Sequence, residues 1–228
     1  MGKAKMKKLR EVSGFSFVYE NKNFLAPAIN DFEGNIIDWR GTWAEKAFKN
    51  SQPITMELAC GKGDYTIALA ERFPERNFIG VDIKGDRLWR GALTVQSKGL
   101  TNVIFVRTKI EQLDLFFAPH EIDEIWITFP DPFPKKPDAK RRLSAPTFLA
   151  LYKTLIKENG TIHFKTDALD LFDYTEGSMK EAGYEMLTVQ RDIYGNGLED
   201  EITSIKTYYE LMHIADARTI NYLKAIVK

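Results

Sequence analysis

The chain has 228 residues, of which 44% are hydrophobic and 28% are charged, with 32 basic and 32 acidic side chains. This composition is that of a soluble globular protein with a sizeable core, and it excludes an intrinsically disordered chain. One cysteine excludes an internal disulfide, and no apolar run reaches the roughly 18 residues that a membrane-spanning helix needs. We therefore expect a cytoplasmic protein with no membrane segment.

Residues 1–50 form a basic, aromatic-rich lead-in, and residues 51–228 are expected to form one domain, because no Ser/Gly/Pro-rich linker divides them. The net charge is zero, but basic residues are clustered. The N-terminal cluster contains Lys3, Lys5, Lys7, Lys8 and Arg10. It fits either a solubilising tail or an arm that binds RNA, and both interpretations stay open.

From residue 53 on, short apolar runs alternate with helical patterns. We expect strands over 53–59, 77–82, 102–107, 124–129 and 161–165, and helices over 64–73, 86–97, 110–117, 145–157 and 168–181. Residues 185–192 and 202–214 look extended, and turn-rich residues 194–198 separate them. The pattern predicts an α/β fold with a doubly wound, mostly parallel sheet of seven strands that ends in an antiparallel C-terminal strand.

The first of these strands runs into the loop Glu-Leu-Ala-Cys-Gly-Lys-Gly at 57–63, and the second ends at Asp82. Gly61 and Gly63 let the backbone approach a ligand, and an acid at the second strand's end suits ribose hydroxyls. The loop has no third glycine for a pyrophosphate, which disfavours a dinucleotide-dependent dehydrogenase. Glu57 suits the cationic amino group of methionine, so the pattern favours S-adenosylmethionine.

A second motif places Asp131 between two prolines at the end of an apolar strand. Five basic side chains follow it, at positions 135, 136, 140, 141 and 142. A proline-stiffened acid can hold a reacting group in place, and a dense basic cluster can hold a polyanion. Together they indicate chemistry on a nucleic acid.

Five motifs in order resemble those of the bacterial tRNA (guanine-N7-)-methyltransferases. They are residues 57–63, 129–136 (Phe-Pro-Asp-Pro-Phe-Pro-Lys-Lys), 140–143 (Lys-Arg-Arg-Leu), 163–167 (His-Phe-Lys-Thr-Asp) and 207–210 (Thr-Tyr-Tyr-Glu). The resemblance implies the Rossmann-like class I methyltransferase fold. It also implies transfer of a methyl group from S-adenosylmethionine to N7 of a guanosine in the tRNA variable loop, which gives 7-methylguanosine.

The resemblance also implies roles for individual residues, with Asp131 as the catalytic carboxylate. The expected cofactor-binding residues are Glu57, Gly61, Gly63, Asp82, Lys109, Glu111 and Asp131. The expected nucleoside-binding residues are Lys135, Asp167, Thr207, Tyr208, Tyr209 and Glu210, and the expected RNA-binding residues are Lys136, Pro137, Asp138, Ala139, Lys140, Arg141 and Arg142. Lys109 departs from the acid or amide that is typical of the family, so Lys109, Glu111 or a backbone group supplies the adenine contact.

Guanine N7 carries a lone pair and no proton, so its methylation needs no general base and can rest on alignment and electrostatics. Two rival functions remain: a class I methyltransferase acting on another RNA, a protein or a small molecule, and a non-catalytic RNA-binding protein on the same fold. The three histidines are scattered, so no metal site is expected. A monomer and a homodimer are both compatible with the sequence.

Overall fold

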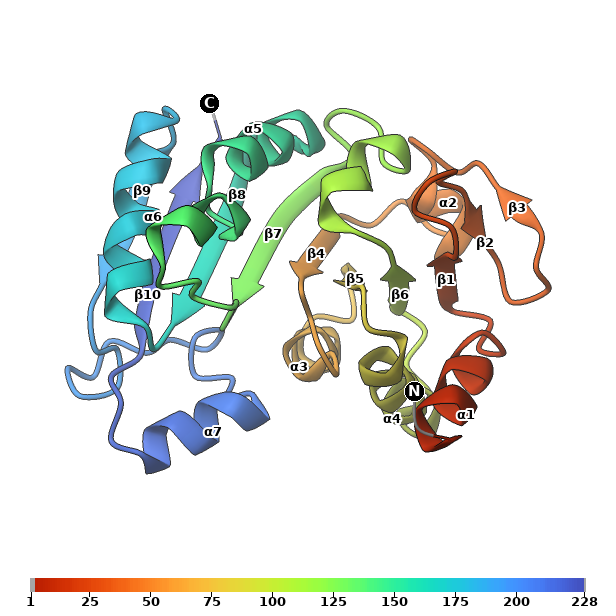
Figure 1. The fold of residues 1–228 in the computed structure, drawn as a ribbon, viewed down its shortest axis with the longest axis horizontal. Helices are drawn as coiled ribbons and strands as arrows, with labels where there is room; N and C mark the ends of the chain where they lie inside the picture. Colours follow the sequence, from red (N-terminus) through yellow and green to blue (C-terminus); the bar gives the residue numbers. More distant parts are fainter. Residues whose placement is uncertain (1–2, 228) are drawn as a thin grey trace.

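The computed structural model describes residues 3–227, whose strands form one sheet in the order β3-β2-β1-β6-β5-β4-β7-β8-β10-β9 (Figure 1). The strands are β1 (Val18–Asn21), β2 (Ile29–Asn30), β3 (Ile36–Ile37), β4 (Ile54–Leu58), β5 (Asn77–Asp82), β6 (Val103–Arg107), β7 (Ile122–Thr128), β8 (Ile156–Thr166), β9 (Glu185–Gln190) and β10 (Asn221–Ile226). The helices are α1 (Lys3–Val12), α2 (Trp43–Ala47), α3 (Asp64–Arg72), α4 (Gly85–Lys98), α5 (Pro146–Leu155), α6 (Leu169–Glu181) and α7 (Tyr208–Ala215), with 3-10 helices η1 (Ile110–Leu115) and η2 (Lys136–Arg141).

The centre of the sheet is parallel. Strands β1, β6, β5, β4, β7 and β8 run in one direction, and β10 lies antiparallel between β8 and β9. Every residue of β4 and β5 is buried, as expected for parallel strands that are covered on both faces. The predicted α/β fold with an antiparallel C-terminal strand is confirmed.

The number of strands differs from the expected seven. The sheet has ten strands over the described residues, because β1 pairs with β6 and β2 and β3 extend that edge. All three come from the lead-in, whose strands are only two to four residues long. Such short runs give no clear alternation of apolar and polar residues.

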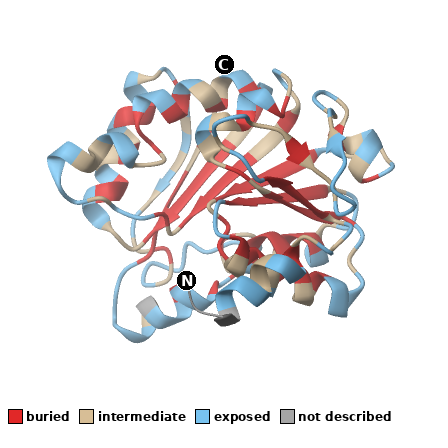
Figure 2. Cartoon of the chain, turned by 45° about the vertical axis from the view of Figure 1, so that its right-hand side comes forward, coloured by how far each residue is buried: buried red, intermediate tan, exposed pale blue. Residues whose placement is uncertain are grey.

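Helices cover both faces of the sheet (Figure 1). On one face, Trp43, Phe148 and Phe172 from α2, α5 and α6 belong to one hydrophobic cluster. On the other face, Tyr65 of α3 and Leu88 of α4 belong to a second cluster. Figure 2 shows the strands almost entirely buried between helices whose outer faces are exposed. No helix within residues 3–227 is long and apolar enough to cross a membrane.

The expected extended segment at 202–214 is wrong. Residues 201–204 form turns, Tyr208–Ala215 is helix α7, and the last strand is Asn221–Ile226. Thr207 begins the helix with a capping box, in which its hydroxyl accepts from the backbone N–H of Glu210 and the Glu210 carboxylate accepts from the Thr207 N–H. Two orphan donors are thereby satisfied, and this outweighs the strand preference of the neighbouring Ile, Thr and Tyr residues.

Candidate functional site

A cavity of about 880 Å³ lies at the carboxyl ends of the central strands. Its lining includes Ala59, Asp82, Lys109, Glu111, Asp131, Phe133, Lys140, Arg141 and, from α5, Thr147, Leu151 and Thr154. β4 has β5 on one side and β7 on the other, so the chain order reverses here. Ligands of doubly wound sheets bind at such a reversal.

The loop after β4 has the backbone of a close-contact turn. Ala59, Gly61 and Gly63 have φ values of 55°, 60° and 71°. A Cβ on Gly63 would stand 2.6 Å from the Phe105 ring, so both its conformation and its surroundings require glycine. Gly61 donates its N–H to Asp82 Oδ2 at 2.9 Å, which fixes this loop to the end of β5.

Asp82 borders the cavity and is only 5% exposed. Its other oxygen, Oδ1, accepts the Lys84 N–H at 2.7 Å. Burial raises the pKa of this carboxyl, while the two backbone donors and the charge of Arg87 act in the opposite direction. Each oxygen keeps further acceptor capacity, so Asp82 can receive hydroxyl groups of a ligand.

Glu57 lies beneath the loop and is not among the residues that line the cavity. Thr128 Oγ1 donates to its Oε1 at 2.7 Å, and both the N–H and the hydroxyl of Thr66 donate to its Oε2. Burial raises the pKa of Glu57 to about 7, although these hydrogen bonds oppose the shift. In this structure Glu57 joins β4, β7 and α3, and its contact with a cofactor stays a prediction.

Asp131 is exposed and borders the cavity from the opposite side to Asp82, on the loop that follows β7. The loop has an unusual backbone, because Phe129 and Phe133 have φ values of 48° and 41°. Phe129 donates its N–H to the Lys165 carbonyl at 2.8 Å. The loop is therefore tied to β8, and its two prolines restrict it further.

The basic residues after Asp131 have different surroundings. Lys135, Lys136, Lys140 and Arg141 are exposed, and Lys140 and Arg141 reach the cavity. The Arg141 guanidinium lies 4.3 Å from the centre of the Phe133 ring and pairs with Asp138 at 3.5 Å. Arg142 is only partly exposed and donates to backbone carbonyls of the same loop. Exposed positions remain suited to phosphate contacts, whereas Arg142 has a structural role.

The residues expected to bind the target nucleoside are not among those that line this cavity. Asp167 lies after β8, where its Oδ2 pairs with Arg218 at 2.8 Å. Tyr208 and Tyr209 are 55% and 42% exposed on α7. Lys62 of the β4 loop holds its Nζ 4.6 Å from the centre of the Tyr208 ring, so α7 stands next to the glycine loop. A nucleoside-binding role for these residues stays a prediction.

A buried ion pair under α7 was not expected. Lys165 Nζ lies 2.6 Å from Glu210 Oε1, and both side chains are fully buried. Lys165 also donates to the carbonyls of Thr203 and Ile205, and the Tyr194 hydroxyl donates to Glu210 at 2.6 Å. Burial lowers the pKa of Lys165, and the Glu210 charge opposes that shift. The available signal was a lysine inside an apolar strand, since such a charge needs a buried partner.

Of the sequence-predicted residues, Asp82, Lys109, Glu111, Asp131, Lys140 and Arg141 border one cavity. Among residues 3–227, no group of three or more His, Cys, Asp or Glu side chains could hold a metal ion. The cavity thus brings together acids from the ends of β5 and β7 with a basic rim. This set suits a cationic, adenosine-containing ligand on the acidic side and a polyanion at the rim.

Comparison with known proteins agrees with this assignment. A family model described as a putative methyltransferase matches residues 51–220. The chain is 41% identical over 227 residues to the tRNA (guanine-N(7)-)-methyltransferase of Christiangramia forsetii, covering 99% of both chains. It is 47% identical over 185 residues to that of Porphyromonas gingivalis, covering 81% of this chain and 75% of that protein.

The solved structure of a 16S rRNA (adenine(1408)-N(1))-methyltransferase from Catenulisporales acidiphilia, with cosubstrate SAM, resembles the fold with a TM-score of 0.57. The match covers 85% of this chain and 93% of that chain at 15% identity. Fold, cavity and family model together define an α/β methyltransferase with a Rossmann-like sheet. Within that class, the chain belongs to the tRNA (guanine-N(7)-)-methyltransferase family.

Proposed function

We propose that this protein transfers the methyl group of S-adenosylmethionine to N7 of a guanosine in the tRNA variable loop. The observation that carries the proposal is the shared cavity of Asp82 and Asp131, in a chain that is 41% identical to a tRNA (guanine-N(7)-)-methyltransferase over its whole length. The first acid suits the cofactor's ribose and the second stands where the base would meet the cofactor. A tRNA substrate also fits a cytoplasmic site of action.

The residues of the cavity fit S-adenosylmethionine. The volume of about 880 Å³ falls within the roughly 300–1,000 Å³ of small-molecule sites. Asp82 would receive the ribose hydroxyls, and Lys109, Glu111 or a backbone group would contact the adenine. The acids Asp82, Glu111, Asp114 and Asp131 around the cavity suit a cationic ligand. When bound, this cosubstrate supplies an electrophilic methyl group.

Asp131 would act through its charge rather than as a base. Guanine N7 attacks with a lone pair and loses no proton, while the electron pair of the broken carbon–sulfur bond goes to sulfur. Positive charge therefore accumulates on the guanine ring in the transition state. A fixed carboxylate near that ring stabilises the transition state more than the ground state.

Asp167 is proposed to receive the guanine edge, because N1–H and the exocyclic amine become better donors as charge develops. Asp131 and Asp167 follow β7 and β8, which are hydrogen-bonded neighbours in the sheet. Arg218 pairs with Asp167 and favours its ionised form. The two carboxylates thus belong to adjacent strand ends at one edge of the sheet.

The proposal is tested by incubating the protein with methyl-labelled S-adenosylmethionine and unmodified tRNA, and by identifying the labelled nucleoside. We expect 7-methylguanosine, and Asp131→Asn should lower turnover about 100-fold, as loss of one electrostatic group in an active site does. Asp173→Asn is the matched control, because Asp173 lies on α6 with its side chain 54% exposed. A different labelled nucleoside, or no label, would contradict the proposal.

A further inference from the structure

We infer that α1 and the beginning of α4 form a second binding surface for the tRNA backbone, separate from the loop at 135–142. This inference rests on the proposed function, since it concerns the same substrate. We call this surface the α1/α4 face and define it by residues 5–12 and 84–90. The two helices contact each other directly.

The α1/α4 face is a built element rather than a loose tail. Leu9 packs where a Cβ on Gly85 would come within 2.8 Å of its Cδ2, so the glycine allows α1 to approach α4 closely. The Trp89 indole N–H donates to Glu11 Oε2 at 2.8 Å, and Lys8 Nζ lies 4.8 Å from the centre of the Trp89 ring. These contacts fix the direction in which the basic side chains of α1 project.

The apolar side of α1 is already used in this packing. Val12 is fully buried within the hydrophobic cluster that contains Leu88, and Leu9 is half-buried against the start of α4. A basic helix that enters a membrane surface keeps its apolar side free for the acyl chains. The α1/α4 face therefore offers charge without a free apolar stripe, which suits a nucleic-acid backbone.

Charge on the α1/α4 face is strongly asymmetric, although the chain as a whole is neutral. Its basic side chains are Lys5, Lys7, Lys8, Arg10, Lys84, Arg87 and Arg90, and its acidic side chains are Glu11 and Asp86. Lys5 pairs with Asp86 at 3.5 Å and Lys7 with Glu11 at 3.7 Å. Within residues 3–227, the side chains of Arg10 and Arg90 form no ion pair or hydrogen bond, and both are exposed. An excess of positive charge is thus left toward solvent.

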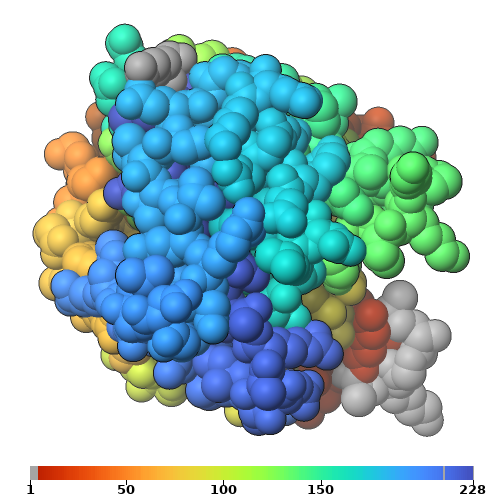
Figure 3. Space-filling model, turned by 90° about the vertical axis from the view of Figure 1, so that its left-hand side faces the viewer, coloured from red at the N-terminus to blue at the C-terminus, as the bar shows by residue number. Residues whose placement is uncertain are grey.

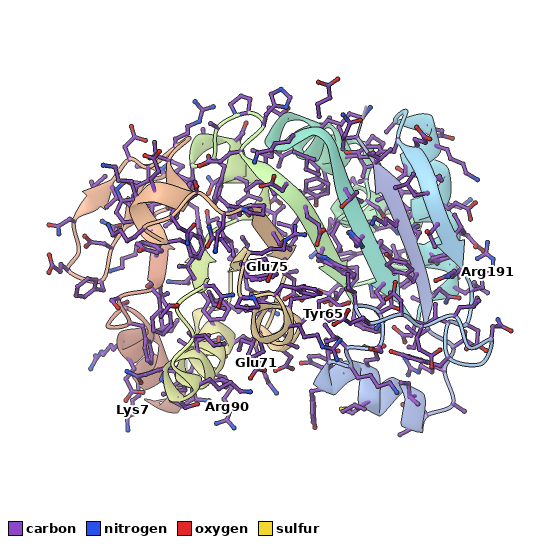
Figure 4. The ribbon with its side chains drawn as sticks, turned by 180° about the vertical axis from the view of Figure 1, so that it is seen from behind. Lys7, Tyr65, Glu71, Glu75, Arg90 and Arg191 are labelled. Atoms are coloured by element: carbon purple, nitrogen blue, oxygen red, sulfur yellow. The ribbon has the colours of Figure 1, made fainter. Side chains whose placement is uncertain are left out.

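The α1/α4 face begins at the cavity. Lys84 donates its N–H to Asp82, and the charges of Lys84 and Arg87 act on the Asp82 carboxyl. Figure 3 shows the green segment near residues 130–140 and red helix α1 projecting from the same side of the molecule, with a hollow between them. Figure 4 shows Lys7 of α1 and Arg90 of α4 directed outward from the same end of the protein. A substrate in the hollow would meet basic side chains on both sides.

Two basic surfaces around one cavity suit a folded RNA better than a short strand. The variable loop would enter the hollow, and phosphates on either side of it would reach Lys140 and Arg141 on one side and Arg10 and Arg90 on the other. Contacts of this kind position the RNA without reading its sequence. The α1/α4 face would therefore contribute affinity and register, and guanosine recognition would stay at the cavity.

The test is tRNA binding by the double variant Arg10→Gln/Arg90→Gln. Dissociation constants are measured by fluorescence anisotropy with labelled unmodified tRNA from 50 to 300 mM salt, without cofactor. Each lost phosphate contact lowers the slope of log K against log salt by roughly 0.7 to 0.9, so we expect the slope to fall by about 1.5 and affinity at about 0.15 M salt to fall about tenfold. Thermal unfolding of both proteins confirms that the variant folds.

The matched control is Lys46→Gln/Lys49→Gln, which removes two exposed basic charges near α2, on the other face of the sheet. The control should bind tRNA like the wild type. If the Arg10/Arg90 variant and the control have the same affinity and salt slope, the inference is wrong. A loss of binding to anionic phospholipid vesicles with unchanged tRNA binding would also contradict it. Because binding is measured without methyl transfer, this result stays separate from a failure of the proposed function, which is a wild type that produces no 7-methylguanosine.

Discussion

Arg142 donates two hydrogen bonds to the carbonyl oxygen of Phe133, from Nε at 3.3 Å and from Nη2 at 3.1 Å. Its Nε also lies 3.1 Å from the Pro132 carbonyl, and its guanidinium stands 4.4 Å from the centre of the Tyr174 ring on α6. Phe133 has a φ of 41°, which is a strained conformation for a bulky residue. Arg142 therefore stabilises the loop in the shape that places Asp131 at the cavity.

This role predicts that Arg142→Ala lowers kcat more than it weakens tRNA binding. A loop that moves by about 1 Å can cost about 100-fold in rate, whereas one exposed phosphate contact costs far less. Arg142→Lys should recover only part of the rate, because an ammonium group cannot reproduce the planar fork that meets both carbonyls. Steady-state kinetics with tRNA separates kcat from KM. A raised KM with unchanged kcat would show instead that Arg142 contacts the RNA.

The Lys165–Glu210 pair predicts a large stability loss when one partner is neutralised. Glu210→Gln leaves the Lys165 ammonium buried with weaker partners, and breaking a buried pair costs roughly 3–5 kcal/mol of unfolding free energy. Urea unfolding measures this loss. Glu71→Gln is the control, because the Glu71–Lys98 pair is 42% exposed on both sides and should contribute less than about 1 kcal/mol. Equal small losses in the two variants would contradict a structural role for the buried pair.

Glu57 predicts a pH dependence of stability. Its pKa is raised from 4.5 to about 7 in the folded protein, so the folded state holds a proton that the unfolded state has lost between these values. Its contribution to stability is therefore full below about pH 4.5 and is lost as pH rises through 7, by roughly 3 kcal/mol. The Glu57→Gln variant, which resembles the protonated acid in shape, should lack this decline. Urea unfolding of both proteins from pH 5 to 8 measures the difference, and parallel curves would contradict it.

The central part of this protein could be predicted from local sequence. The alternating apolar and helical patterns of residues 53–181 gave the sheet order its basis, and strands β4, β5 and β7 end at the residues that carry the site. Asp82 and Asp131 could be placed at one cavity because parallel strands end at one edge of a sheet. These inferences need only short-range pattern and topology.

Other features depend on contacts that the linear sequence does not display. The segment before α7 is rich in Ile, Thr and Tyr, and its helix rests on the Thr207 cap and on burial of Glu210 against Lys165. Arg142 belongs to a basic run that reads as solvated, yet its partners are carbonyls nine and ten residues earlier in the chain. In both cases tertiary hydrogen bonds outweigh local preference.

The most direct measurement uses two tRNA transcripts that differ at one atom. In one, the variable-loop guanosine is replaced by 7-deazaguanosine, whose ring has a C–H group where guanine has the N7 lone pair. With labelled S-adenosylmethionine, we expect methyl incorporation into the normal transcript and none into the substituted one, while both transcripts bind the protein with equal affinity. Equal incorporation into both transcripts would contradict methylation of guanine N7.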